Sequence, residues 1–284
     1  MAEPRIVRVF PRRTSYTPKD ELAFIGDPPM LPFRPYRDEV DEVHVSVAFT
    51  WDIAEGRRLA AAWAKYFRVV KLGGPALGEA GNGFTPGLYV KPGVVFTSRG
   101  CNNRCPWCLV PWREGRLRLL PIQDGWVIQD NNFLQCPREH RLAVYRMLGR
   151  QRYGAVFSGG IDARLVNDEI AAEFRDLRIA AVFLAADTDA ALRPLESAVQ
   201  RLAFLGRRKL RCYVMVGYGG ETIEQAERRL RAVWEIGAMP FCQLYQPPDR
   251  YIRYDCEWRE LQRTWSRPAA TKAAARSALE VYYD

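Results

Sequence analysis

Alternation between short apolar segments and amphipathic segments constrains the fold of this chain more than any other feature of its sequence. From residue 93 onward the pattern predicts strands at residues 93–98, 125–132, 154–160, 180–187, 211–220 and 240–247. It predicts helices between most of them, at residues 138–148, 167–177, 192–205 and 222–234. Repeated βα units of this kind are right-handed, and the loops at the carboxyl ends of their parallel strands gather the functional groups. We therefore expect an α/β domain, built either as a barrel or as an open sheet.

The segments on either side of this repeat have different patterns. Residues 1–40 are rich in proline, which predicts an extended arm lying over a domain. A strand at 43–51, a helix at 55–67 and a strand at 67–74 follow and predict a small α/β unit. After residue 248 the chain becomes aromatic and charged and then alanine-rich, which predicts a C-terminal helical cap. We expect three regions, at residues 1–92, 93–248 and 249–284.

Bulk composition limits the class of protein and the kind of partner. The chain has 284 residues, of which 48% are hydrophobic, and this suits a globular protein rather than a disordered tail or a coiled coil. Its apolar runs fall short of a membrane span, and its N-terminus has no signal-peptide pattern, so we expect a cytoplasmic location and no membrane partner. The formal net charge of +9 favours an anionic partner such as a nucleotide or nucleic acid. The arginines are nevertheless spread along the chain, and solvated helix faces explain most of them.

Three of the seven cysteines, Cys101, Cys105 and Cys108, form a CxxxCxxC sequence directly after a predicted strand. Three thiolates at this spacing fit one face of a cubane iron–sulfur cluster and leave one iron without a protein ligand. An open iron binds a substrate and transfers an electron into it, whereas a fourth cysteine would make an electron carrier. The spacing therefore predicts a catalytic [4Fe-4S] cluster.

Zinc is the main alternative for the same thiols, and it would make the chain a nucleic-acid-binding protein with a structural zinc site. Structural zinc sites have four ligands, usually in paired motifs. No second pair follows the three cysteines, and His44 and His140 lack paired spacing. A disulfide oxidoreductase is disfavoured because Pro106 and the residues after it discourage the helix that such a motif opens. The other cysteines are expected to be small buried hydrophobes, namely Cys136, Cys212, Cys242 and Cys256.

The segment SRGCNNRCPWC resembles the signature of the radical S-adenosylmethionine (SAM) superfamily, with aromatic Trp107 just before the last cysteine. The resemblance covers residues 93–247 and implies a partial (β/α)6 TIM-like barrel. It implies a [4Fe-4S] cluster on the three cysteines, which reductively cleaves SAM to methionine and a 5′-deoxyadenosyl radical that abstracts hydrogen from a substrate. It also implies an external one-electron reductant of the flavodoxin or ferredoxin type.

The resemblance also implies positions for the parts of SAM, residue by residue. The amino group of SAM would be held after the second strand, by Gln129, Asp130 and Asn131, with Asp130 the best single choice. Asp187 stands where the family places a ribose-binding residue, although it equally suits an N-cap. The turn VGYGGET resembles the adenine-binding turn of the family, which implies roles for Val216 and Gly217.

Asp162 and Arg164, after the third strand, are suited either to the SAM carboxylate or the substrate, or to a capping aspartate and a surface arginine. Cys242, which we place at the end of the sixth strand, is our candidate for a hydrogen-atom donor. An auxiliary cluster on Cys136, Cys242 and Cys256 has no ligand spacing to support it.

Two further segments resemble the cobalamin-linked branch of the superfamily. The QDNN sequence at residues 129–132 is similar to an aspartate-rich variant found in that branch. Residues 43–74 look like the second half of a cobalamin-binding domain, but they are too short for the whole domain and contain no DxHxxG sequence. We expect a vestigial Rossmann-like unit that does not bind cobalamin.

Overall fold

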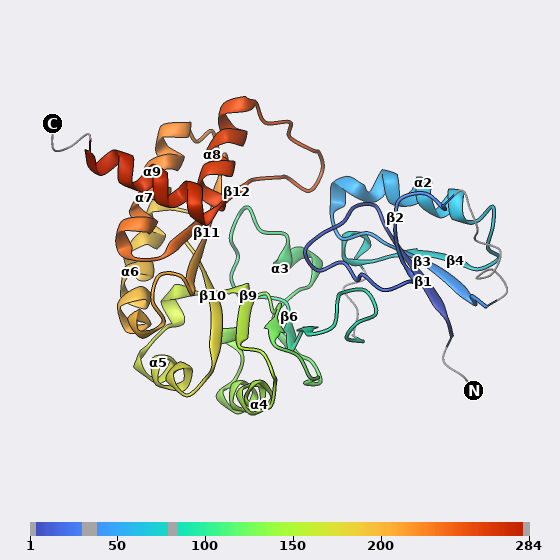
Figure 1. Cartoon of the computed structure of the whole chain (residues 1–284), viewed down its shortest axis with the longest axis horizontal. Helices are drawn as coiled ribbons and strands as arrows, with labels where there is room; N and C mark the ends of the chain where they lie inside the picture. Colours follow the sequence, from blue (N-terminus) through green and yellow to red (C-terminus); the bar gives the residue numbers. More distant parts are fainter. Residues whose placement is uncertain (1–3, 30–38, 79–84, 281–284) are drawn as a thin grey trace. The chain divides into compact units, whose positions relative to one another are not determined.

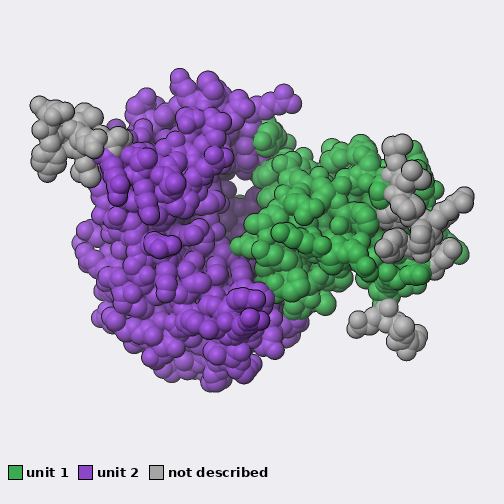
Figure 2. Space-filling model, viewed as in Figure 1, with its two compact units in different colours: residues 1–94, 112–114, 248–251 green, residues 95–111, 115–247, 252–284 purple. Residues whose placement is uncertain are grey.

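The computed structural model describes residues 4–29, 39–78 and 85–280. The chain divides into two compact units, shown in different colours in Figure 2. Unit 1 comprises residues 1–94, 112–114 and 248–251, and unit 2 comprises residues 95–111, 115–247 and 252–284. Each unit has its own β-sheet. Among the described helices, none is long and apolar enough to cross a lipid bilayer.

Unit 2 is built on a six-stranded sheet in the order β12-β11-β10-β9-β8-β5. The pairs β8–β9, β9–β10, β10–β11 and β11–β12 are parallel. The strands are β5 (Val94–Val95), β8 (Val127–Ile128), β9 (Ala155–Ile161), β10 (Ile179–Ala185), β11 (Leu210–Val216) and β12 (Met239–Leu244). Spatial order follows chain order, as successive βα units of one hand produce. The predicted α/β fold is confirmed at this level.

Helices connect most of these strands and lie along the outer side of the sheet (Figure 1). The burial pattern of β11 explains this position of the helices. Alternate residues of the strand are buried, namely Leu210, Cys212, Val214 and Val216, while the residues between them are half-buried. The connecting helices are α4 (Arg138–Gly149), α5 (Asp168–Arg175), α6 (Leu192–Arg201) and α7 (Ile223–Ile236). Short 3-10 turns precede or follow them: η3 (Phe133–Gln135), η4 (Ala163–Leu165), η5 (Asp189–Ala191) and η6 (Ala203–Leu205).

The predicted C-terminal cap forms two helices, α8 (Cys256–Ser266) and α9 (Pro268–Glu280), and belongs to unit 2. Helix α8 packs on β12, where the Ser266 hydroxyl donates to the Cys242 carbonyl at 2.8 Å. Near the start of unit 2, β6 (Ser98–Arg99) pairs antiparallel with β7 (Arg118–Leu119). The one-turn helix α3 (Val110–Arg113) lies between them in the chain.

Unit 1 contains a four-stranded parallel sheet in the order β2-β1-β3-β4. Its strands are β1 (Ile6–Phe10), β2 (Ala23–Ile25), β3 (Glu42–Ser46) and β4 (Val70–Gly73), with η1 (Thr50–Asp52), α2 (Ile53–Trp63) and η2 (Pro75–Leu77). The predicted strand, helix and strand at residues 43–74 are therefore present. The prediction of an extended arm over residues 1–40 is wrong for the part that is described, because β1 is a central strand of this sheet. Val7 and Val9 are completely buried, and the prolines of the segment lie outside β1 and β2.

Candidate functional site

The cysteine loop, residues 101–108, follows β5 and β6 in unit 2. The Cys101 amide donates to the Gly115 carbonyl at 3.1 Å, and the Cys108 amide donates to the Cys105 carbonyl at 3.0 Å. Gly100 enters the loop with a φ of +82°, and a Cβ atom there would lie 2.2 Å from the Arg116 carbonyl oxygen. Only glycine fits this approach, so the backbone fixes where the loop begins.

The three loop thiols are half-buried, in contrast to Cys136, Cys212 and Cys242, which are buried, and Cys256, which is exposed. Burial raises the pKa of the Cys105 thiol, and the negative charges of Cys108, Asp187 and Cys101 raise it further. The Cys101 and Cys108 thiols are therefore close enough to Cys105 to influence its ionisation. The positive charge of Arg164 acts in the opposite direction.

The donor set suits a thiolate-bound metal centre. The Asn103 amide lies 3.4 Å from the Cys101 sulfur, and the Asn132 side-chain amide lies 3.9 Å from the same sulfur. Hydrogen bonds of this kind stabilise metal-bound thiolates. Within residues 4–29, 39–78 and 85–280, no group of three or more Cys, His, Asp or Glu side chains is already arranged to hold a metal ion.

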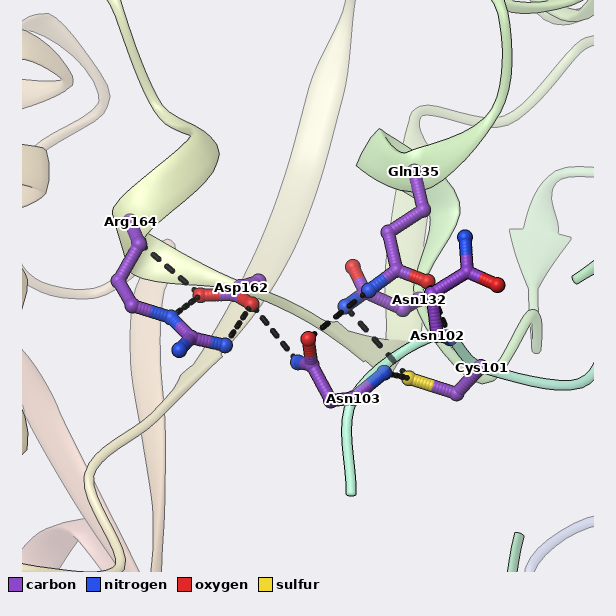
Figure 3. A network of polar contacts seen from close by, with 7 residues as sticks. All are labelled: Cys101, Asn102, Asn103, Asn132, Gln135, Asp162 and Arg164. Atoms are coloured by element: carbon purple, nitrogen blue, oxygen red, sulfur yellow. Dashed lines mark hydrogen bonds and ion pairs between the residues drawn. The ribbon is translucent and has the colours of Figure 1, made fainter. Parts of the chain in front are cut away.

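A polar network ties the loop to the segments that follow β8 and β9 (Figure 3). The Asn102 amide donates to Gln135 Oε1 at 2.8 Å, and Gln135 Nε2 donates to Asn103 Oδ1 at 3.1 Å. Asn103 Nδ2 then donates to Asp162 Oδ2 at 2.8 Å. Both asparagines of the CNNRC sequence are therefore fixed by partners on other elements. Sequence analysis missed them because nothing local identifies those partners.

Asp162 and Arg164 form a side-chain pair at the edge of this network. Arg164 donates to Asp162 through Nε at 2.9 Å and Nη2 at 2.6 Å. Asp162 also accepts from the Arg164 amide at 3.1 Å and so caps η4. The capping alternative is thus confirmed for Asp162, and the arginine side chain is 61% exposed. Burial would raise the pKa of Asp162, but hydrogen bonds from Arg164 and Asn103 lower it overall.

The side-chain oxygens of residues 129–131, which follow β8, already accept hydrogen bonds from protein groups. Gln129 Oε1 accepts from the Ser158 hydroxyl at 2.7 Å, and Asn131 Oδ1 accepts from the Gly100 amide at 2.9 Å. Asp130 is 1% exposed and accepts three hydrogen bonds from residues 97 and 98. Burial raises the pKa of Asp130, and these donors act against the rise. The side chains predicted to hold the SAM amino group are therefore directed at protein groups.

Asn132, which the sequence analysis did not select, has a different environment. It is 4% exposed, and its Oδ1 atom has no hydrogen-bond partner among the described residues. A buried acceptor without a donor costs free energy, which is recovered when a ligand supplies the donor. Its position directly after QDN was the only sequence signal for it.

A cavity of about 430 Å³ opens beside the cysteine loop in unit 2. Trp107 from the loop, Asp187 after β10, and Met215 and Tyr218 around the end of β11 contribute to its wall. The Trp107 and Tyr218 rings meet edge to face, with centroids 5.6 Å apart. Because the carboxyl ends of parallel strands share one edge of a sheet, residues distant in the chain meet there. Trp107 links the cavity directly to the cysteine loop.

Asp187 accepts from the Met215 amide at 2.9 Å. Burial raises its pKa, while the Met215 amide, the charge of Arg229 and a hydrogen bond from Trp107 lower it. The N-cap alternative for Asp187 is wrong, because Thr188 is the N-cap of η5 and Ala191 that of α6. A carboxylate at a cavity wall with spare acceptor capacity suits a ligand with hydroxyl groups.

The glycine turn after β11 lines the cavity through residues 218–221, whereas Val216 is buried in the sheet and Gly217 packs on another side chain. A Cβ atom at Gly217 would lie 2.7 Å from the Tyr254 hydroxyl. Glu221 accepts from the Gly217 amide at 2.9 Å and pairs with buried Arg229 at 2.5 Å. The sequence analysis missed Glu221 and Arg229, and an arginine on the apolar face of a predicted helix was the available signal.

Cys242 lies inside β12, two residues before its last residue, rather than at the end of the strand as predicted. Its exposed fraction is 0%, and burial raises its pKa to about 12. It does not line the cavity beside the cysteine loop. Cys136 is also buried and Cys256 begins α8, so the structure does not favour an auxiliary cluster on these cysteines.

Comparison of the sequence with known proteins found no protein-family model and no curated protein that matches it.

Proposed function

We propose that this chain is a radical SAM enzyme, with a [4Fe-4S] cluster held by Cys101, Cys105 and Cys108. One observation carries the proposal: the three-thiol loop and the cavity share Trp107, at the edge of a sheet whose strands follow chain order. The ligand set leaves one coordination position of a cubane cluster for SAM. The sheet is consistent with a partial (β/α)6 barrel of the radical SAM type.

The wall of the cavity matches the adenosine part of SAM. Trp107 and Tyr218 offer aromatic surface to a purine, and the carboxylate of Asp187 accepts hydrogen bonds from ribose hydroxyls. Glycines at residues 219 and 220, both with positive φ, let the backbone approach the base. The cavity volume of about 430 Å³ is in the range of small-ligand sites.

We assign the amino group of SAM to Asn132 rather than to Asp130. Asp130 already accepts three hydrogen bonds within the protein, whereas Asn132 Oδ1 is buried and lacks a donor among the residues that the structure describes. An ammonium group supplies that donor, and the side-chain amide of Asn132 remains directed at the Cys101 sulfur.

When bound, the reduced cluster would cleave SAM and so supply the radical that abstracts hydrogen from the substrate. The chain itself contributes the three thiolates, the buried acceptors and the cavity beside the cysteine loop. The electron would come from an external flavodoxin- or ferredoxin-type protein. The net charge of +9 supports an anionic substrate, such as a nucleotide or nucleic acid.

Anaerobic reconstitution of the full chain with iron and sulfide tests the proposal. We expect close to four irons per chain, broad visible absorption and dithionite-dependent 5′-deoxyadenosine. Cys105→Ala should abolish all three, and Cys256→Ala is the matched control, because it removes an exposed cysteine outside the loop. A colourless protein that binds zinc and makes no 5′-deoxyadenosine would instead support the structural-zinc alternative.

A further inference from the structure

Four of the seven residues 129–135 contact the cysteine loop or the residues just before it. Asp130 binds residues 97 and 98, Asn131 binds the residue 100 amide, and Asn132 lies against the Cys101 sulfur. Gln135 then bonds residues 102 and 103. We call residues 129–135 the template segment.

Asp130 has the strongest contacts in this template segment. Its Oδ1 accepts from the Thr97 amide at 2.6 Å, and its Oδ2 accepts from the Thr97 and Ser98 hydroxyls at 2.6 and 2.7 Å. Thr97 and Ser98 have exposed fractions of 0%. All three donors are neutral, and hydrogen bonds to a buried carboxylate are stronger than those between neutral groups.

We infer that Asp130 is a positioning residue, which holds residues 97–103 in the conformation that presents the cysteines before any metal arrives. This positioning role deepens the proposed function. The part of it that concerns the conformation of residues 97–103 does not depend on that function. A positioning role accounts for a carboxylate that is buried, accepts only from the loop approach and contributes no atom to the cavity. The backbones of β9 and the template segment also pack closely, because a Cβ atom at Gly159 would lie 1.9 Å from the Asp130 carbonyl oxygen.

Asp130→Ala and Asp130→Asn separate this role from a general contribution to stability. Alanine removes every acceptor, whereas asparagine keeps an oxygen for the Thr97 amide and gains an amide that donates to the two hydroxyls. Asp168→Ala is the matched control, because that carboxylate on α5 is 93% exposed.

The measurement is residue-resolved hydrogen exchange of the metal-free full chain, followed by iron analysis after reconstitution. We expect Asp130→Ala to reduce the protection of the Thr97, Gly100 and Asn102 amides by about tenfold or more, because the hydrogen bonds that fix residues 97 and 98 are lost. Amides of β11 should keep their protection, iron incorporation should fall, and asparagine should restore both properties largely. Asp168→Ala should resemble the unaltered chain.

Unchanged exchange at residues 97–102 in Asp130→Ala would overturn the inference, as would an equal loss of protection throughout β11. The exchange measurement needs no metal. It therefore decides the inference even if the unaltered chain binds no iron and the proposed function fails.

Discussion

In both units carboxylates follow parallel strands, but their hydrogen-bond partners differ. In unit 1, Asp52 is 5% exposed and forms a two-bond ion pair with Arg12, at 2.7 and 2.5 Å. In unit 2, Asp130 meets only neutral donors, and Asp187 accepts from a backbone amide beside a cavity. A carboxylate paired with arginine holds the fold together, whereas one bound by neutral groups is available to order a loop or to meet a ligand. This difference agrees with the proposal that the site lies at the edge of the unit 2 sheet.

Substitution of one glycine near each sheet edge should give the largest effects and so tests the comparison most strongly. Gly100 and Gly74 both have positive φ, and a Cβ atom would lie 2.2 Å from the Arg116 carbonyl oxygen in one case and 2.7 Å from the Val47 amide nitrogen in the other. We expect Gly100→Ala to reduce iron incorporation to background, because the cysteine loop is displaced. Gly74→Ala should lower the free energy of unfolding by more than about 2 kcal/mol and leave iron unchanged. Iron analysis and denaturant unfolding distinguish them, and loss of iron in both variants would contradict the division.

The two carboxylates themselves give the next largest effect. Asp187→Asn should weaken SAM binding roughly 10- to 100-fold, because it replaces a charged acceptor at the cavity wall by a neutral one. Asp52→Asn should leave SAM binding unchanged and lower the free energy of unfolding by roughly 1.5–3 kcal/mol, the contribution of a charged hydrogen bond. Equilibrium dialysis and denaturant unfolding measure the two quantities. Unaltered SAM affinity in Asp187→Asn would remove that residue from the site.

The sequence contained enough information for most strands and helices, because local periodicity determines them. It failed at β1, where five residues with a buried valine pattern were hidden among prolines. The sequence identified the residue types of the candidate site, but it did not show which partners their side chains face. Asp130 faces Thr97 and Ser98, more than thirty positions earlier, and Arg229 reaches Glu221 from the next helix. Side-chain partners of this kind depend on the assembled sheet, which periodicity does not describe.

A smaller effect concerns pH and the buried thiols of unit 2. Burial raises the pKa of Cys242 from 9.0 to about 12, so the folded state keeps a proton that the unfolded chain loses above pH 9. The free energy of unfolding should therefore be unaffected by this thiol below pH 9 and fall by about 1.4 kcal/mol per pH unit from there toward pH 12. Cys242→Ala should remove this part of the slope. Cys256→Ala, which removes an exposed thiol, should retain it in denaturant titrations at pH 8–10.5.

The smallest effect compares a tryptophan from each unit. Hydrogen bonding from the Trp107 indole acts to lower the pKa of Asp187, whereas the indole nitrogen of Trp51 is buried without a hydrogen-bond partner among the described residues. Phenylalanine preserves the ring contacts of both, with Tyr218 in one case and Phe49 in the other. Trp107→Phe should weaken SAM binding roughly threefold to tenfold, the value of one hydrogen bond, and Trp51→Phe should leave it unchanged. Isothermal titration measures the SAM affinity of both variants. Equal affinities would mean that Trp107 contributes only aromatic surface to the cavity wall and that its indole nitrogen adds nothing to SAM binding.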